Sequence, residues 1–141
     1  MASRPSDDFA DSIVYLVRTA LGDALRSVIY FTPDEFEVLY LRSGLYADDP
    51  SRVRSVKEPL VENERLGFSS QETYQDLFGD ESTEPDIGEY EYTIRVFSKG
   101  FVCRVLVDDH GVIVTTDELD IAEFEAQAVS LRSLLATENR T

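Results

Sequence analysis

Residues 92–116 read YTIRVFSKGFVCRVLVDDHGVIVTT, and this stretch decides the fold. Three β-rich runs, at 90–97, 101–107 and 112–116, are joined here by Lys99-Gly100 and by Asp109-His110. We take each junction as a two-residue hairpin loop, because Gly, Asp and Asn favour such turns. The stretch therefore predicts a meander of three antiparallel strands.

The alternation of side chains in this meander predicts one continuous apolar face. With the two loops chosen in this way, Ser98 lies opposite Phe101, and Asp108 lies opposite Gly111. One face then carries Tyr92, Ile94, Val96, Cys103, Val105, Val107, Val112 and Val114. A slip of one residue in either hairpin would break this face, so the two loops support each other.

The opposite face of the meander carries a pair of arginines. The same register places Arg95 directly opposite Arg104, beside Phe97, Leu106 and Ile113. Like charges directly across a strand pair are unfavourable. The pair therefore calls for a carboxylate or another anion nearby.

Three sources of that negative charge stay open at this stage. Acids of the same chain, such as Glu62 or Glu64, would neutralise the two arginines internally. Alternatively, an anionic small ligand would bind there, because Arg suits carboxylates and phosphates. In the third alternative, the whole face, with Phe97, Leu106 and Ile113, forms an interface with a protein partner or a second copy of the chain.

The rest of the chain predicts helices around a five-stranded sheet. Apolar residues at helical spacing predict a first helix at about 7–25, with Ser6 before it as the cap. Two β-rich runs follow at 28–31 and 36–41, and a four-residue turn between them places Phe31 opposite Phe36 and Ile29 opposite Val38.

The middle of the chain predicts a connection and then helical segments. We expect a connection at 43–58, a helix at 59–66 broken at Gly67, and a short helix that a capping box opens at Ser69. A mobile acidic loop is expected at 79–89, and a last helix runs from the cap Asp120 to about residue 136. The fold class is therefore α+β, a single domain over 1–141 in the order α-ββ-α-βββ-α, with frayed termini.

The acidic charge of the chain excludes some partners. Asp and Glu number 28 against 13 Lys and Arg, so the formal net charge is −15. We therefore expect no nucleic acid and no anionic membrane surface as partner, because both need a basic footprint. Only Lys57 and Lys99 are lysines, and the acids are spread along the chain. This composition favours adaptation to a cytoplasm of molar salt, where charges are screened within about 3 Å. An acidic face for a basic partner is the rival interpretation.

The residue types that carry catalysis are scarce. His110 and Cys103 are the only residues of their types, so we take His110 as a turn residue and Cys103 as a core residue. Neither can complete a nucleophilic triad, no glycine-rich phosphate loop is present, and we expect no metal and no cofactor. The lone cysteine and the absence of a long apolar run favour the cytoplasm.

One stretch is more basic than the rest. Arg52, Arg54 and Lys57 lie within six residues of one another. We take them as solvated residues that pair with nearby acids, and a basic patch that binds a partner is the alternative.

Several strings resemble a group of small haloarchaeal proteins of unknown function. They are VENERLGF (61–68), YTIRVF (92–97), DHGVIVTTD (109–117), LRSLL (131–135), RSVIYFT (26–32) and YLR (40–42). The resemblance implies a halophilic host and no particular activity. Separately, the order of elements is similar to that of roadblock and longin-type domains, which implies a dimerising scaffold for protein partners. PAS- and GAF-like sensor domains share much of this plan and would imply a small ligand.

These observations favour a non-enzymatic regulatory or protein-interaction module that forms a homodimer. The alternative is a sensor of a small anion at Arg95 and Arg104. An enzyme has the least support, because it would need a pair of carboxylates in a cleft.

Overall fold

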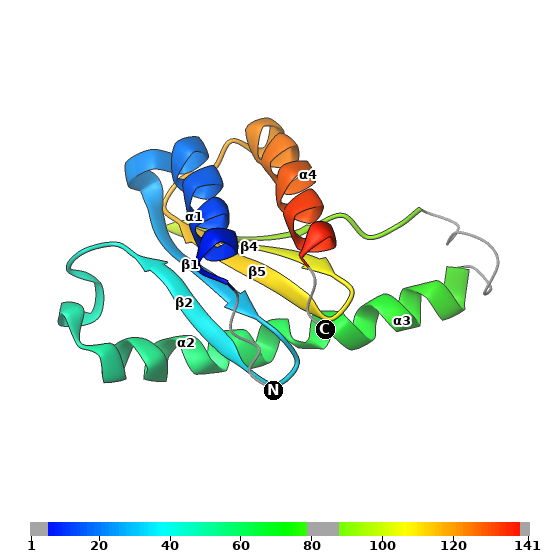
Figure 1. The fold of residues 1–141 in the computed structure, drawn as a ribbon, viewed down its shortest axis with the longest axis horizontal. Helices are drawn as coiled ribbons and strands as arrows, with labels where there is room; N and C mark the ends of the chain where they lie inside the picture. Colours follow the sequence, from blue (N-terminus) through cyan, green and yellow to red (C-terminus); the bar gives the residue numbers. More distant parts are fainter. Residues whose placement is uncertain (1–5, 79–87, 139–141) are drawn as a thin grey trace.

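The computed structural model describes residues 6–78 and 88–138. Within them, five strands form one antiparallel sheet in the order β2-β1-β5-β4-β3. The strands are β1 Leu25–Phe31, β2 Phe36–Leu41, β3 Thr93–Phe97, β4 Gly100–Val107 and β5 His110–Thr116. Helices cover both faces of this sheet (Figure 1). The α+β class and the order of elements are therefore as the sequence predicts.

Two helices pack side by side on one face of the sheet (Figure 1): α1 Asp7–Leu21 and α4 Ile121–Thr137. Ser6 caps α1 by accepting from the Phe9 amide at 3.2 Å, and Asp120 caps α4 by accepting from the Glu123 amide at 3.1 Å. Their buried stripes meet the apolar face of the meander in the larger core, which includes Phe9, Ile13, Val17, Val28, Tyr30, Val105, Val112, Phe124, Ala128 and Leu131.

The other face is covered by α2 Pro50–Glu64, which continues into α3 Leu66–Phe78. A smaller core lies beneath them, made of Ile29, Phe31, Val61, Leu106 and Ile113. Two short 3-10 helices, η1 Gly22–Ala24 and η2 Leu45–Asp48, connect the first helix to β1 and β2 to α2. Because both sheet faces are covered, the hairpin β1–β2 can be apolar on both sides, as its sequence requires.

The registers of the two later hairpins differ from the prediction by two residues. Phe97 pairs with Gly100, and Val107 pairs with His110, so the loops are Ser98-Lys99 and Asp108-Asp109. Asp108 takes the left-handed turn conformation, with φ 55°. A shift of two residues keeps every side chain on its predicted face, so the apolar face of the meander is preserved.

Gly100 and Gly111 lie in strands rather than in loops, and neither position has room for a side chain. A Cβ atom on Gly100 would lie 2.8 Å from the Thr116 carbonyl oxygen. On Gly111 it would lie 2.5 Å from Leu106 Cδ2 and 2.7 Å from the Val105 carbonyl oxygen. Close packing thus requires glycine at both positions, where the sequence predicts turns. In the first hairpin, Phe31 pairs with Phe36 and Ile29 with Val38, which confirms the predicted register.

The helical boundaries in the middle of the chain differ more. The predicted connection at 43–58 is largely α2, because Asp49 caps a helix that begins at Pro50 and continues past Pro59. The capping box predicted at Ser69 is wrong: its hydroxyl donates to the Leu66 carbonyl at 3.1 Å, inside α3. Smaller differences are the end of α1 at Leu21 and the starts of β1 at Leu25 and β3 at Thr93.

The expected acidic loop at 79–89 lies outside the described residues except for 88–89, and so do the outermost residues of both termini. Within the described part of the chain, every helix is too short or too polar to cross a membrane.

Candidate functional site

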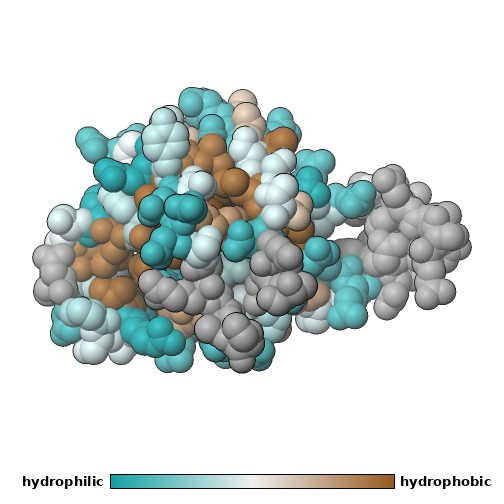
Figure 2. Space-filling model, in the orientation of Figure 1, coloured by the Kyte–Doolittle hydropathy of each residue, from teal (hydrophilic) through white to brown (hydrophobic). Residues whose placement is uncertain are grey.

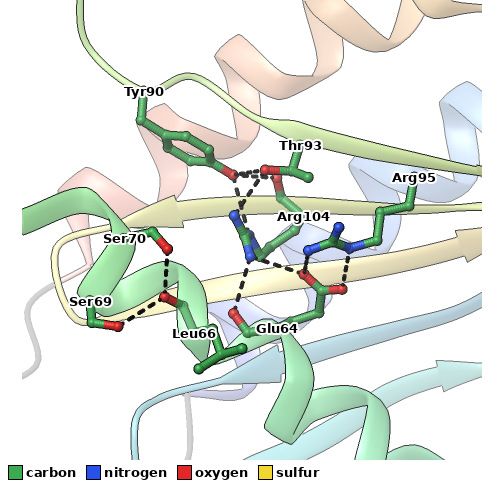
Figure 3. Close-up of polar contacts among 8 residues, drawn as sticks. All are labelled: Glu64, Leu66, Ser69, Ser70, Tyr90, Thr93, Arg95 and Arg104. Carbon is green, nitrogen blue, oxygen red and sulfur yellow. Dashed lines mark hydrogen bonds and ion pairs between the residues drawn. The ribbon is translucent and has the colours of Figure 1, made fainter. Parts of the chain in front are cut away.

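The last residue of α2 supplies the carboxylate that the two arginines require. Glu64 is fully buried, and its carboxylate accepts from Arg95 Nε at 2.7 Å and from Arg104 Nη1 at 3.0 Å (Figure 3). A second Arg95 nitrogen, Nη2, lies 3.3 Å from the other carboxylate oxygen. Glu62, the other acid considered from the sequence, pairs with Arg65 instead, at 2.9 Å.

The two arginines are diagonal neighbours, which corrects the prediction that they face each other. Thr93 pairs with Arg104, and Arg95 pairs with Val102. The corrected register leaves both guanidiniums on the face under α2, where one carboxylate can reach both. The repulsion between the two arginines is thus smaller than in the predicted facing pair, because they are diagonal neighbours and because Glu64 pairs with both.

Arg104 is held at every side of its guanidinium (Figure 3). Besides Glu64, its Nη2 donates to the Thr93 hydroxyl at 2.9 Å and its Nε to the Tyr90 hydroxyl at 3.4 Å. The Tyr90 hydroxyl donates in turn to the Arg104 carbonyl at 2.9 Å. This set of bonds satisfies a nearly buried cation and ties α2 to β3 and β4.

The adjacent turn of α3 approaches Arg104 closely. Gly67 is buried, and a Cβ atom there would lie 2.6 Å from the guanidinium carbon of Arg104 and 2.7 Å from Leu106 Cδ1. The glycine predicted to break the helix therefore allows α3 to lie against Arg104.

Arg95 differs from Arg104 because it reaches the surface. Its side chain is 42% exposed, and its hydrogen bond to Glu64 raises its pKa above the ordinary value, against a smaller effect of burial. One carboxylate faces two guanidiniums, so one positive charge remains in this cluster. Arg95 presents that charge at the edge of the sheet.

Only part of the predicted interface is accessible. Leu106 and Ile113 are buried under α2, which corrects their place in a surface that a partner would contact. Phe97 is 58% exposed, and its neighbour Val96 is 69% exposed. Because consecutive strand residues point to opposite faces, the end of β3 extends beyond the helical cover on both sides of the sheet.

The three residues of the basic stretch do not share one surface. Arg52 is exposed, and the Arg54 guanidinium lies over the Phe36 ring at 4.2 Å from its centre. Lys57 is buried, with its ammonium 5.4 Å from the centre of the Tyr46 ring. Arg52 and Arg54 are therefore exposed, whereas Lys57 lies on the buried side of α2.

Apolar surface also gathers in two places on the face drawn in Figure 2, between α1 and α4 and between β2 and the start of α2. The second place includes a cavity of about 500 Å³ that Phe36, Val38 and Val53 line together with Arg54.

His110 is a core residue, which corrects its prediction as a turn residue. Its Nε2 lies 2.8 Å from the Leu135 carbonyl oxygen, and its Nδ1 lies 2.7 Å from the Tyr30 hydroxyl. A carbonyl only accepts, so Nε2 carries a proton, and in the neutral imidazole Nδ1 then accepts from the Tyr30 hydroxyl. His110 therefore connects β1, β5 and α4.

Cys103 lies in the larger core, as the strand pattern predicts, and burial raises the pKa of its thiol to about 12. Among residues 6–78 and 88–138, no group of three His, Cys, Asp or Glu side chains could hold a metal ion.

The profile of the DUF7522 family matches residues 11–136, most of the chain. The chain belongs to this family. The family is described as a domain of unknown function, and no curated protein sequence matches the chain.

Solved structures show the type of fold. Myxococcus xanthus MglB is similar with a TM-score of 0.56 and 10% identity, over 99% of this chain and 98% of that chain. A structure described as MglB with tetrameric arrangement is similar with a TM-score of 0.53 and 12% identity, over 93% and 96%. At such identities the likeness concerns the fold, which is of the roadblock/longin type.

Proposed function

We propose that this DUF7522 protein is a non-enzymatic regulatory or protein-interaction module that assembles as a homodimer through the outer edge of β3. The observation that carries the proposal is the exposure of Val96 and Phe97 at the end of this edge strand. Exposed apolar side chains beside unpaired strand backbone are typical of a surface that another chain covers.

The edge lacks the usual protection against pairing. Within the described residues, β3 pairs only with β4, so its outer row of backbone groups is open. Natural sheets protect such edges with lysine, proline or bulges. In β3 the one charged residue is Arg95, which pairs with the buried Glu64 although its side chain is 42% exposed. The backbone of β3 is therefore available to a partner strand.

A second copy of the chain is the occupant that fits this edge. Two antiparallel copies of β3 related by a two-fold axis present the same surface to each other, so pairing closes after two chains. The tetrameric arrangement of one MglB structure supports self-association for this fold.

The proposal has two further parts, the salt concentration of the working environment and the non-enzymatic role. We propose a cytoplasm of molar salt as the working environment, because the net charge of −15 would otherwise oppose association. A non-enzymatic role is supported by the contacts of the reactive side chains, since Glu64 binds two arginines, His110 joins Tyr30 and Leu135, and Cys103 lies in the core.

Light scattering in molar KCl tests the proposal. The wild-type chain should show about twice its mass of 15.9 kDa. Phe97→Glu should reduce the mass to that of one chain while the circular dichroism spectrum is kept. Val129→Glu is the matched control, because Val129 is 59% exposed but lies on α4 and not in β3, and this variant should remain a dimer. A wild-type monomer at every concentration would contradict the proposal.

A further inference from the structure

A pocket lies between α2 and the hairpin of β3 and β4, and neither the family description nor the fold gives it a function. Its volume is about 270 Å³. Three basic residues line it: Arg26 from β1, Lys57 from α2 and Lys99 from the hairpin loop. Apolar side chains such as Leu60 and Val102 form much of the remaining wall. The pocket thus combines positive charge with an apolar wall.

The charge of this pocket is opposite to that of the chain. Acidic residues outnumber basic ones 28 to 13, yet no Asp or Glu is among the pocket's lining residues in the part of the chain that the structure describes. Both lysines of the chain, Lys57 and Lys99, are among them. Such a concentration of cations in an acidic protein indicates a local requirement for positive charge.

Lys57 is the buried cation of the pocket. It is 3% exposed, its ammonium is hydrogen-bonded to the Tyr46 side chain, and it takes part in none of the ion pairs between the side chains that the structure describes. Arg26, by contrast, pairs with Asp117 at 3.2 Å. A buried ammonium without a counter-charge destabilises a fold, so its retention favours a role in binding.

Tyr46, whose ring contacts Lys57, is held in an uncommon conformation. Tyr46 has φ 55°, in the left-handed region that favours glycine, and its ring faces the Lys57 ammonium. Burial lowers the pKa of Lys57, more than Tyr46 raises it, and Arg26 lowers it further. A negative charge in the pocket would raise the pKa of Lys57 and so oppose both of these lowering effects.

We propose that this pocket binds a small organic anion with an apolar body, in its simplest form a monocarboxylate. The carboxylate accepts from the Lys57 ammonium, and the apolar part lies against Leu60 and Val102. A cavity of about 270 Å³ limits the ligand to a small molecule. This inference does not depend on the proposed dimer.

Titration of the full chain with benzoate and with benzamide tests the charge requirement. Both probes have the same shape, and only benzoate is charged. At constant molar KCl, benzoate should shift the amide resonances of Gly100 and Thr116 in a saturable way. Benzamide should bind at least about tenfold more weakly, because it lacks the charge-assisted hydrogen bond. Equal binding of the two probes, or no saturable binding of benzoate, would overturn the proposal.

Variants of α2 identify the residue responsible. Lys57→Met keeps the volume and removes the charge, so it should weaken benzoate binding at least about tenfold and raise the melting temperature without ligand. Arg52→Met is the matched control on the same helix, outside the pocket, and should bind benzoate like the wild type. Wild-type affinity in Lys57→Met would overturn the assignment. Should that variant not fold, the comparison of benzoate with benzamide on the wild-type chain decides.

Discussion

The Glu64 carboxylate lies 3.0 Å from the Arg104 guanidinium, and both groups are buried between α2 and β4. Glu64 is also the last residue of α2, where the helix dipole disfavours a negative charge. A carboxylate that is fully buried is costly to the fold unless it is paired, so the arginines of the sheet are needed beside it. This relationship fixes the end of α2 over β3 and β4.

Glu64→Gln should lower the free energy of unfolding by about 3 kcal/mol, because Arg104 would remain buried without its counter-charge. Urea denaturation at constant KCl measures this change. Glu62→Gln is the matched control, two residues earlier on the exposed side of α2, and should change the value by less than about 1 kcal/mol. Equal effects of both variants would contradict a special role of Glu64.

Gly67→Ala should destabilise the protein by about 1–3 kcal/mol, although alanine favours helices more than glycine does. The added methyl group would lie 2.6 Å from the Arg104 guanidinium carbon and would push α3 away from the sheet. Thermal unfolding measures the effect. Ser69→Ala, at an exposed position of the same helix, should have little effect. A Gly67→Ala variant as stable as the wild type would show that α3 does not pack against Arg104.

Asp117 should contribute stability that depends on pH. Its carboxylate accepts from Arg42 at 2.7 Å and from Arg26 at 3.2 Å, and these hydrogen bonds lower its pKa. Because the folded pKa is below the unfolded one, the contribution is present above about pH 4 and is lost as the pH falls through the folded pKa. Asp117→Asn should therefore melt lower than the wild type at neutral pH, and the difference should decrease in acid. A difference that persists unchanged at pH 2 would contradict this.

The sheet was predictable from the sequence because strand alternation repeats every two residues. The error in both later hairpins was two residues, so Cys103 and Val105 remained on the correct face. The positions of the loops were not predictable. Glycine is typical of turns, but Gly100 and Gly111 are strand residues at which a Cβ atom would collide with neighbouring atoms. The sequence does not reveal the start of α2, because proline is typical of a first helical turn, whereas Pro59 lies inside this helix.

The candidate site was predictable in part. Two arginines on one face indicated a nearby carboxylate, and Glu64 was one of the acids considered. The burial of Leu106 and Ile113 under α2 was not predictable, because it depends on a helix whose first half was read as a connection. The pocket at Lys57 was not predictable for the same reason, because a basic stretch in a connection is expected to be exposed, whereas α2 turns Lys57 toward the sheet.

The melting temperature should rise with KCl concentration, and unfolding in dilute buffer should be reversed by molar salt. The cause is self-repulsion at a net charge of −15, which salt screens. Differential scanning calorimetry over a series of KCl concentrations measures this. A midpoint independent of salt would contradict the proposed environment.

Hydrogen exchange at the β3 edge tests the central claim most directly. Amide exchange of residues 93–97 is compared at low and high protein concentration in molar KCl, with Phe97→Glu as the control that stays monomeric. The proposed dimer predicts that exchange in β3 slows as the wild-type concentration rises and stays unchanged in Phe97→Glu. Exchange in β3 that is independent of concentration, while the wild-type chain is dimeric by mass, would contradict assembly through this edge.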